Sequence, residues 1–168
     1  YGTTPGQTGR FADHILAPKG LPLSAKFSVK MPDTWTPTFD LSDLQKVRRI
    51  NLNAEQEIDF AIKKIQSRSA GDYMRNKVPT ILAKTFYGLE YDAMRKTSHF
   101  KIENSCIGCG LCAKNCPVSA IEIRNKKPVW VKDRCVMCLS CLHHSPKFAI
   151  QYENRTKKHG QYTNPNVK

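Results

Sequence analysis

The cysteines of this chain are confined to one short segment, and this constrains the fold more than any other feature. All seven lie between Cys106 and Cys141 of a 168-residue sequence. Disulfide frameworks distribute their cysteines so that distant segments become connected, and an odd number leaves one cysteine unpaired. The pattern therefore favours metal binding in a reducing compartment over an oxidised secreted scaffold. With no apolar run long enough to span a bilayer and no signal segment at the start, we expect a cytoplasmic protein.

The cysteine-rich segment contains an internal repeat with an offset of 29 residues. The alignment places Cys106 on Cys135, Cys109 on Cys138, Cys112 on Cys141, Pro117 on Pro146, Ala120 on Ala149 and Ile121 on Ile150. Two copies of one small unit indicate a pseudo-twofold architecture. The same offset places Cys116 on Ser145, so the second copy lacks the last cysteine of the first.

The spacing of the first copy, C-x2-C-x2-C-x3-C-P, predicts iron-sulfur binding. Three cysteines on a tightly wound loop present their sulfurs to three corners of an iron-sulfur cube. Gly108 and Gly110 suit such a loop, because a backbone without bulky side chains can turn its N–H donors toward sulfide. Zinc is the main alternative, but it takes two separated pairs of ligands around one tetrahedral ion, and three-cysteine runs ending in Cys-Pro fit that arrangement poorly.

Over residues 100–152 the chain resembles the bacterial two-cluster ferredoxins, on both cysteine runs and the prolines that follow them. The resemblance implies a compact (βαβ)2 fold in which each copy contributes a short helix and strands. It also implies one complete [4Fe-4S] cluster, with the ligands Cys116, Cys135, Cys138 and Cys141. A second cluster, [4Fe-4S] or [3Fe-4S], would be held by Cys106, Cys109, Cys112 and the residue at position 145.

Ser145 departs from the family pattern, and the chain has no eighth cysteine to replace it. Four outcomes are open. Ser145 Oγ binds the fourth iron; the fourth iron carries water, His144 or an exogenous ligand; the fourth iron is absent; or the whole site is empty. Because oxygen is a harder donor than thiolate, ligation by serine should lower the reduction potential. We expect His143 and His144 to be ordinary packing or exposed histidines.

Residues 1–67 alternate between helix and strand patterns. Apolar spacing from Thr8 predicts a helix that stops at Pro18, and the alternation over residues 23–31 predicts a strand. Asn53 is the expected N-cap of a second, amphipathic helix. One helix, one strand and one helix cannot close a core alone, so we expect the front of an α/β domain to be missing.

The head, the tail and the segment MPDTWTPTF resemble a family that fuses a flavodoxin-like domain to a two-cluster ferredoxin module. The resemblance implies an α+β chain with a partial flavodoxin-like domain over 1–67, a linker with a docking helix over 68–99, and a two-cluster ferredoxin domain with a basic tail over 100–168. For the helix near residues 78–89, a membrane-surface helix is the alternative.

The same resemblance implies that the first six residues form the second flavin loop. These are Tyr1, Gly2, Thr3, Thr4, Pro5 and Gly6. They would line FMN only in a longer protein that also supplies the phosphate-binding loop. We therefore expect no tight FMN binding by this chain.

The chain is strongly basic, with a formal net charge of +13 and 12 Lys or Arg against 4 Asp or Glu in residues 101–168. Nucleic acid, an acidic membrane and an acidic redox partner are candidate contacts. No aromatics are interleaved with Lys and Arg as in RNA-binding sheets, so we expect no specific nucleic acid. We expect an electron carrier, exchanging single electrons with a redox partner protein or a flavin. The alternatives are an enzyme with an open iron site on three cysteines and a cluster-stabilised basic interaction module.

Overall fold

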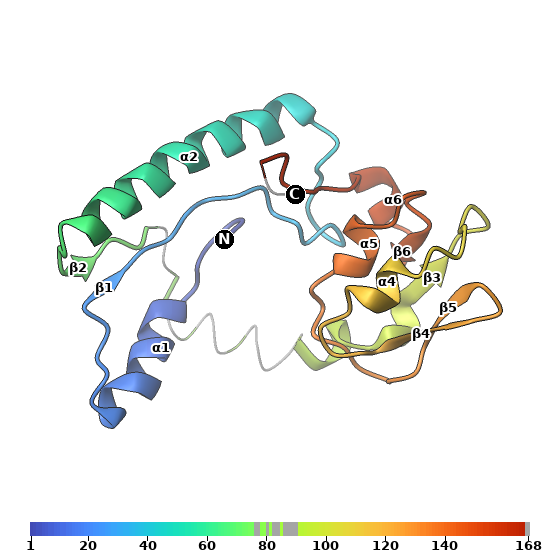
Figure 1. Ribbon diagram of the computed structural model, residues 1–168, viewed down its shortest axis with the longest axis horizontal. Coiled ribbons are helices and arrows are strands. Elements are labelled where there is room, and N and C mark those ends of the chain that lie inside the picture. The colour runs from blue at the N-terminus through green and yellow to red at the C-terminus, as the bar shows by residue number, and fades with distance from the viewer. Residues whose placement is uncertain (76–77, 80, 82–84, 86–90, 167–168) are drawn as a thin grey trace. The chain divides into compact units, whose positions relative to one another are not determined.

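The computed structural model describes residues 1–75, 78–79, 81, 85 and 91–166. The chain divides into two compact units, whose elements are labelled in Figure 1. Unit 1 comprises Tyr1–Asp33 and Leu44–Gly88, and unit 2 comprises Thr34–Asp43 and Leu89–Lys168. The division into flavodoxin-like, linker and ferredoxin parts stays a prediction, and most of the docking helix predicted near residues 78–89 lies outside the described residues.

Over residues 1–75, unit 1 contains two α-helices, a 3-10 helix and one short pair of strands. Its elements are α1 (Thr8–Leu16), the 3-10 helix η1 (Ala17–Lys19), β1 (Ala25–Lys26), α2 (Leu44–Gln66) and β2 (Gly71–Asp72), with β1 and β2 paired in parallel. The helix predicted from Thr8 is confirmed. It tightens into the 3-10 turn at Pro18 and ends at Gly20, whose φ of 76° is a left-handed conformation that suits glycine.

Two predictions for unit 1 were wrong in extent. The strand predicted over 23–31 is regular at only two residues, because the backbone beyond them bonds elsewhere: Val29 O accepts from the terminal amine of Tyr1 at 2.9 Å, and Lys30 N donates to the Glu57 carboxylate at 2.7 Å. Asn53 does not cap a helix. It lies inside α2, which begins nine residues earlier at Leu44.

From Phe100 on, the described residues of unit 2 follow the order β-α-β-β-α-β, and a short helix comes after them. The elements of unit 2 are η2 (Thr97–His99), β3 (Phe100–Ile102), α4 (Leu111–Lys114), β4 (Ile121–Arg124), β5 (Lys127–Trp130), α5 (Ser140–His143), β6 (Ile150–Tyr152) and α6 (Thr156–His159). Strands β3 and β6 pair antiparallel, as do β4 and β5. The mixed α+β composition is as predicted, and the order of elements follows that expected for two βαβ copies.

The repeat seen in the sequence is preserved in the backbone. Helix α4 falls on α5 under the 29-residue offset. Residues with positive φ recur in the same way: Gly108 (68°) with Met137 (52°), Gly110 (77°) with Leu139 (55°), and Ser119 (47°) with Phe148 (47°). A left-handed conformation costs a residue with a side chain about 1–2 kcal/mol. Met137 and Leu139 adopt it nonetheless, so the shape of the cysteine loop overrides local preference.

The core of unit 2 is apolar and lies directly against the cysteines. Its buried residues are Phe100, Met137, Leu139, Leu142, Ile150 and Tyr152, and Cys112, Cys135 and Cys141 pack against them. Phe100 stacks on Trp130 with ring centroids 5.0 Å apart and meets Tyr152 edge-to-face at 5.2 Å. Within the described parts of the chain, no helix is long and apolar enough to cross a membrane.

Candidate metal centres

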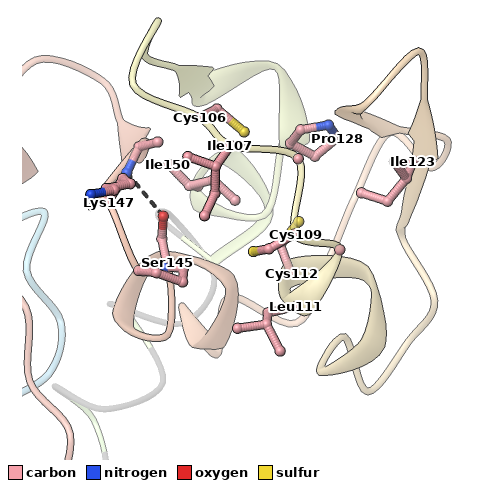
Figure 2. A pocket seen from close by; sticks show the side chains of 14 residues that line it. Cys106, Ile107, Cys109, Leu111, Cys112, Ile123, Pro128, Ser145, Lys147 and Ile150 are labelled. Atoms are coloured by element: carbon pink, nitrogen blue, oxygen red, sulfur yellow. Dashed lines mark hydrogen bonds between the residues drawn. The ribbon is translucent and has the colours of Figure 1, made fainter.

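Three cysteines and Ser145 line one pocket of unit 2, of about 350 Å³ (Figure 2). The cysteines are Cys106, Cys109 and Cys112, from the first run, whereas Ser145 comes from the second run. The loop between β3 and α4 supplies Cys106 and Cys109, and α4 itself supplies Cys112. The turn after α5 supplies Ser145. We call this the first pocket.

Four cysteines line a second pocket, of about 340 Å³, which we call the second pocket. They are Cys116, Cys135, Cys138 and Cys141. Cys116 belongs to the first run, so the last position of each run lies in the pocket of the other run. The structure thus brings together the two sets of side chains that the resemblance implied, and the two pockets have almost the same size.

Backbone N–H groups donate to sulfur and to Ser145 around these pockets. Ala120 N lies 3.2 Å from Cys116 Sγ, and Met137 N lies 3.4 Å from Cys135 Sγ. In the first pocket, Ala149 N donates to Ser145 Oγ at 2.9 Å, the contact drawn in Figure 2. Such donors stabilise negative charge on the atom that accepts, as metal-bound thiolates require.

The partly buried thiols resist ionisation when no cation is near. Burial raises the pKa of Cys141 to about 12, and the neighbouring thiolates of Cys138 and Cys135 add to the effect. Burial also raises the pKa of Cys112 and of Cys135, each with smaller contributions from other cysteines of the same pocket. Thiolates this close together and this buried need positive charge beside them, which iron supplies.

The arrangement does not suit a single metal ion. Four sulfurs bound to one zinc at about 2.3 Å lie within roughly 4 Å of one another. Among the described residues, no group of three or more His, Cys, Asp or Glu side chains is arranged to hold one ion. The cysteines instead line two pockets in sets of three and four, and their C-x2-C-x2-C spacing fits an iron-sulfur cluster better than zinc.

The two histidines beside Ser145 line neither pocket. His143 is buried; its Nε2–H donates to Thr34 O at 2.9 Å, and its Nδ1 accepts from Tyr162 N at 3.2 Å. Both ring nitrogens therefore take part in hydrogen bonds within unit 2. His144 is exposed, and its Nδ1 lies 3.0 Å from Ser140 O in its own helix.

The residues predicted to form a flavin loop are tied to the segment that follows β1. Thr3 Oγ1 donates to Asp33 Oδ2 at 2.8 Å, and Thr4 Oγ1 accepts from Gly6 N at 3.1 Å. Their assignment to FMN stays a prediction.

The sequence reasoning missed the N–H donors at Ala120 and Ala149. The repeat alignment pairs these two alanines, and each lies four residues after the last position of its run. This shared spacing was the sequence feature that could have indicated equivalent donors.

Comparison with known proteins connects the cysteine segment to iron-sulfur binding. Residues 99–122 match a family model described as a 4Fe-4S binding domain. The chain is 40% identical over 62 residues to an uncharacterized polyferredoxin-like protein of Methanocaldococcus jannaschii, covering 29% of this chain and 37% of the relative. It is 65% identical over 23 residues to Ferredoxin-1 of Rhodospirillum rubrum, covering 14% of this chain and 42% of the relative.

The chain therefore spans less than half the length of these two relatives. No solved structure matches it significantly. The matches support a 4Fe-4S binding domain in the cysteine segment, and the named relatives are ferredoxin-like.

Proposed function

We propose that this chain is a two-cluster iron-sulfur electron carrier. The second pocket would hold a [4Fe-4S] cluster on Cys116, Cys135, Cys138 and Cys141. The first pocket would hold another cluster on Cys106, Cys109 and Cys112. The observation that carries this proposal is that the last position of each run lies in the pocket lined by the cysteines of the other run.

The chain contributes ligands, shielding and backbone donors, and a bound [4Fe-4S] cluster supplies one-electron chemistry. Phe100 and Trp130 line the second pocket and keep water from its inner side. Burial and N–H donors to sulfur are two of the factors that set a cluster's reduction potential. The protein's role is thus to hold and tune a carrier rather than to make or break bonds.

Electrons would enter and leave where the ligands reach the surface. Cys109 and Cys138, which are equivalent in the repeat, are exposed, whereas the other five cysteines are partly buried. Two residues before each of them in the chain, Ile107 and Val136 are 58% and 44% exposed. Exposed apolar side chains beside an exposed ligand fit a transient contact with a partner.

The partner we propose is an acidic redox protein or a flavoprotein. Lys114, Lys126, Lys127 and Lys147 are exposed in unit 2, and Lys147 lines the first pocket. Complementary charge speeds encounter between electron-transfer partners and weakens with salt. In a longer protein that supplies the phosphate loop, FMN would be the partner, with Tyr1–Gly6 as its second loop.

Anaerobic reconstitution with iron and sulfide tests the proposal. About eight irons and eight sulfides per chain would support two cubes, and about four would leave only the second pocket filled. A protein that takes up zinc without sulfide, or binds no sulfide, would contradict the proposed function. A Cys138→Ala variant serves as the matched control, because it should lose only the iron of the second pocket.

A further inference from the structure

We propose that Ser145 Oγ is the fourth protein ligand of the first pocket, so that the chain carries two chemically unequal clusters. This inference rests on the proposed function. It selects one of the four outcomes that the sequence leaves open, and it follows from the geometry of the turn that holds Ser145.

The side chains of Cys116 and Ser145 are held in the same way. Each accepts a hydrogen bond from the backbone N–H four residues later, Ala120 N at 3.2 Å and Ala149 N at 2.9 Å. Cys116 Sγ faces the second pocket, and Ser145 faces the first. The 0.3 Å difference between the two contacts agrees with the shorter reach of an O acceptor compared with S. Ser145 Oγ therefore occupies the place that a cysteine sulfur would take.

The backbone that carries the two residues is also the same. The amides of Cys116 and Ser145 donate to the carbonyls three residues earlier, Ala113 O and Leu142 O, each at 3.3 Å. Their own carbonyls accept from Ser119 N at 3.1 Å and Phe148 N at 2.9 Å. The turn has thus kept the shape of a ligand-bearing turn although the ligand atom has changed.

Gln161 holds this turn from the tail of the chain. Its Nε2 donates to Leu142 O at 2.7 Å and to Ser145 O at 2.9 Å. A side chain that fixes the backbone on both sides of a potential ligand limits the ligand's movement, as outer residues do around metal sites.

No other lining residue of the first pocket suits a fourth iron. Apart from the three cysteines, its described lining contains only two side chains with a polar atom, Ser145 and Lys147. The ammonium of lysine has three donors and no lone pair, so it does not bind a metal when protonated. The histidines lie outside the lining, as described above. Ser145 is therefore the one remaining side chain of this described lining that can coordinate iron.

Ligation by Ser145 keeps the charge balance of a four-cysteine site. On binding iron, Ser145 would give up its Oγ–H proton to solvent and coordinate through Oγ, so the side chain would carry one negative charge as a thiolate does. Ala149 N–H then donates to a charged oxygen, which is stronger than donation to a hydroxyl. Because alkoxide is harder and more basic than thiolate, it stabilises the oxidised state. The cluster of the first pocket should therefore have a lower reduction potential than the cluster of the second pocket.

Four proteins test the inference: wild type, Ser145→Cys, Ser145→Ala and the control Ser105→Ala, whose serine is exposed and next to a ligand cysteine. After anaerobic reconstitution, we measure iron, sulfide, the EPR spectrum and a stepwise reductive titration. Wild type and Ser105→Ala should bind about eight irons, show no oxidised-state signal, and reduce in two separate steps. In Ser145→Cys, the step at lower potential should shift upward while the other step stays. Ser145→Ala should lose about one iron and gain an oxidised-state signal.

The outcomes separate the inference from the proposed function. If Ser145→Ala binds eight irons and its reduction steps are unchanged, water is the fourth ligand. If wild type binds seven irons, the first pocket holds a [3Fe-4S] cluster. Either result overturns the inference and leaves the proposed function standing. If Ser145→Ala fails to fold, an unshifted lower step in Ser145→Cys still overturns the inference. Wild type that binds no iron with sulfide would overturn the proposed function itself.

Discussion

Cys116 and Ser145 accept equivalent hydrogen bonds on equivalent turns, through sulfur at 3.2 Å in one copy and through oxygen at 2.9 Å in the other. The loss of the eighth cysteine is therefore a change of one atom type in a conserved geometry, and not a disordered end of the repeat. Since each side chain faces the pocket of the opposite run, the two positions exchange roles across the pseudo-twofold relation.

A swap of the two residues should move the asymmetry from one pocket to the other. In Cys116→Ser/Ser145→Cys, the oxygen ligand lies in the second pocket, so the cluster there should become the harder one to reduce. A reductive titration followed by EPR measures the order of the two steps. The result expected is two steps in reversed order, with the same total iron as wild type.

The single variant Cys116→Ser is the control for this swap. In this variant the two clusters should have similar, low reduction potentials, because each pocket would then have three thiolates and one oxygen. If Cys116→Ser alters the cluster of Cys106, Cys109 and Cys112 instead, the proposed crossing of ligands between runs is wrong.

Removal of one exposed ligand from each pocket should give unequal results. Cys138→Ala and Cys109→Ala remove equivalent ligands, and each should lose the iron of its own pocket. The stability loss should be larger for Cys138→Ala, since the core of unit 2 packs against two cysteines of that pocket, Cys135 and Cys141, and against one of the first pocket, Cys112. Metal binding contributes to folding in small cysteine-rich modules. Iron analysis and chemical unfolding check this. Equal iron loss from both pockets in either variant would argue against separate sites.

The cysteine segment could be predicted from sequence because its spacing is set by cluster chemistry. The offset of 29 residues fixes helices α4 and α5, and ligand sets that cross between runs follow from the resemblance. The unusual conformations of Met137 and Leu139 could not be predicted, because neither residue prefers positive φ; the loop geometry imposes it.

Unit 1 was less predictable, because the sequence pattern there has no covalent or metal constraint. Apolar alternation over residues 23–31 is consistent with a strand, but pairing needs a partner strand, and β2 offers only Gly71 and Asp72. The beginning of α2 was missed because asparagine is a favourable N-cap, whereas the helix continues through Asn53 from Leu44.

Acid should weaken unit 2 through His143. Burial lowers the pKa of this histidine, with a smaller contribution from His144, and outweighs the hydrogen bond to Thr34 O, which raises it. The folded state then favours the neutral ring, whereas the unfolded chain binds a proton below its ordinary value of 6.5. Stability is therefore full above pH 6.5 and declines as the pH falls below it. Protonation would also place a donor on Nδ1, where Tyr162 N already donates.

Denaturant unfolding at pH 8, 7 and 6 measures this effect. Trp35 and Trp130 are the two tryptophans of the chain, and both lie in unit 2, so tryptophan fluorescence follows that unit. His143→Gln should be less stable at pH 8, by about 1–3 kcal/mol for unpaired buried groups, and should lose less stability between pH 8 and pH 6. The exposed His144→Gln is the control, and a His143→Gln protein with the pH dependence of wild type would contradict the assignment.

Gly108 should be the least replaceable glycine of the first pocket. Its φ of 68° resembles the 52° of Met137 at the equivalent position, so conformation alone does not demand glycine. A Cβ at Gly108, however, would collide with the backbone carbonyl oxygen of Lys126 in the turn between β4 and β5. At Gly110, whose φ is 77°, the nearest atom to an added Cβ is Ile123 Cγ1 at 3.9 Å. Only Gly108 combines a left-handed backbone with close approach of a second segment.

Gly108→Ala should therefore cost about 2–5 kcal/mol, from overpacking together with left-handed strain. Gly110→Ala, its matched control, should cost about 1–2 kcal/mol from strain alone. Because Gly108 lies between Cys106 and Cys109, the collision should also displace these ligands, and iron should be lost from the first pocket before the second. Fluorescence-detected unfolding and iron analysis of both variants check the order. Equal losses of stability and iron in the two variants would mean that the β4–β5 turn moves to accommodate the added Cβ. Glycine would then be needed at position 108 only for its backbone conformation.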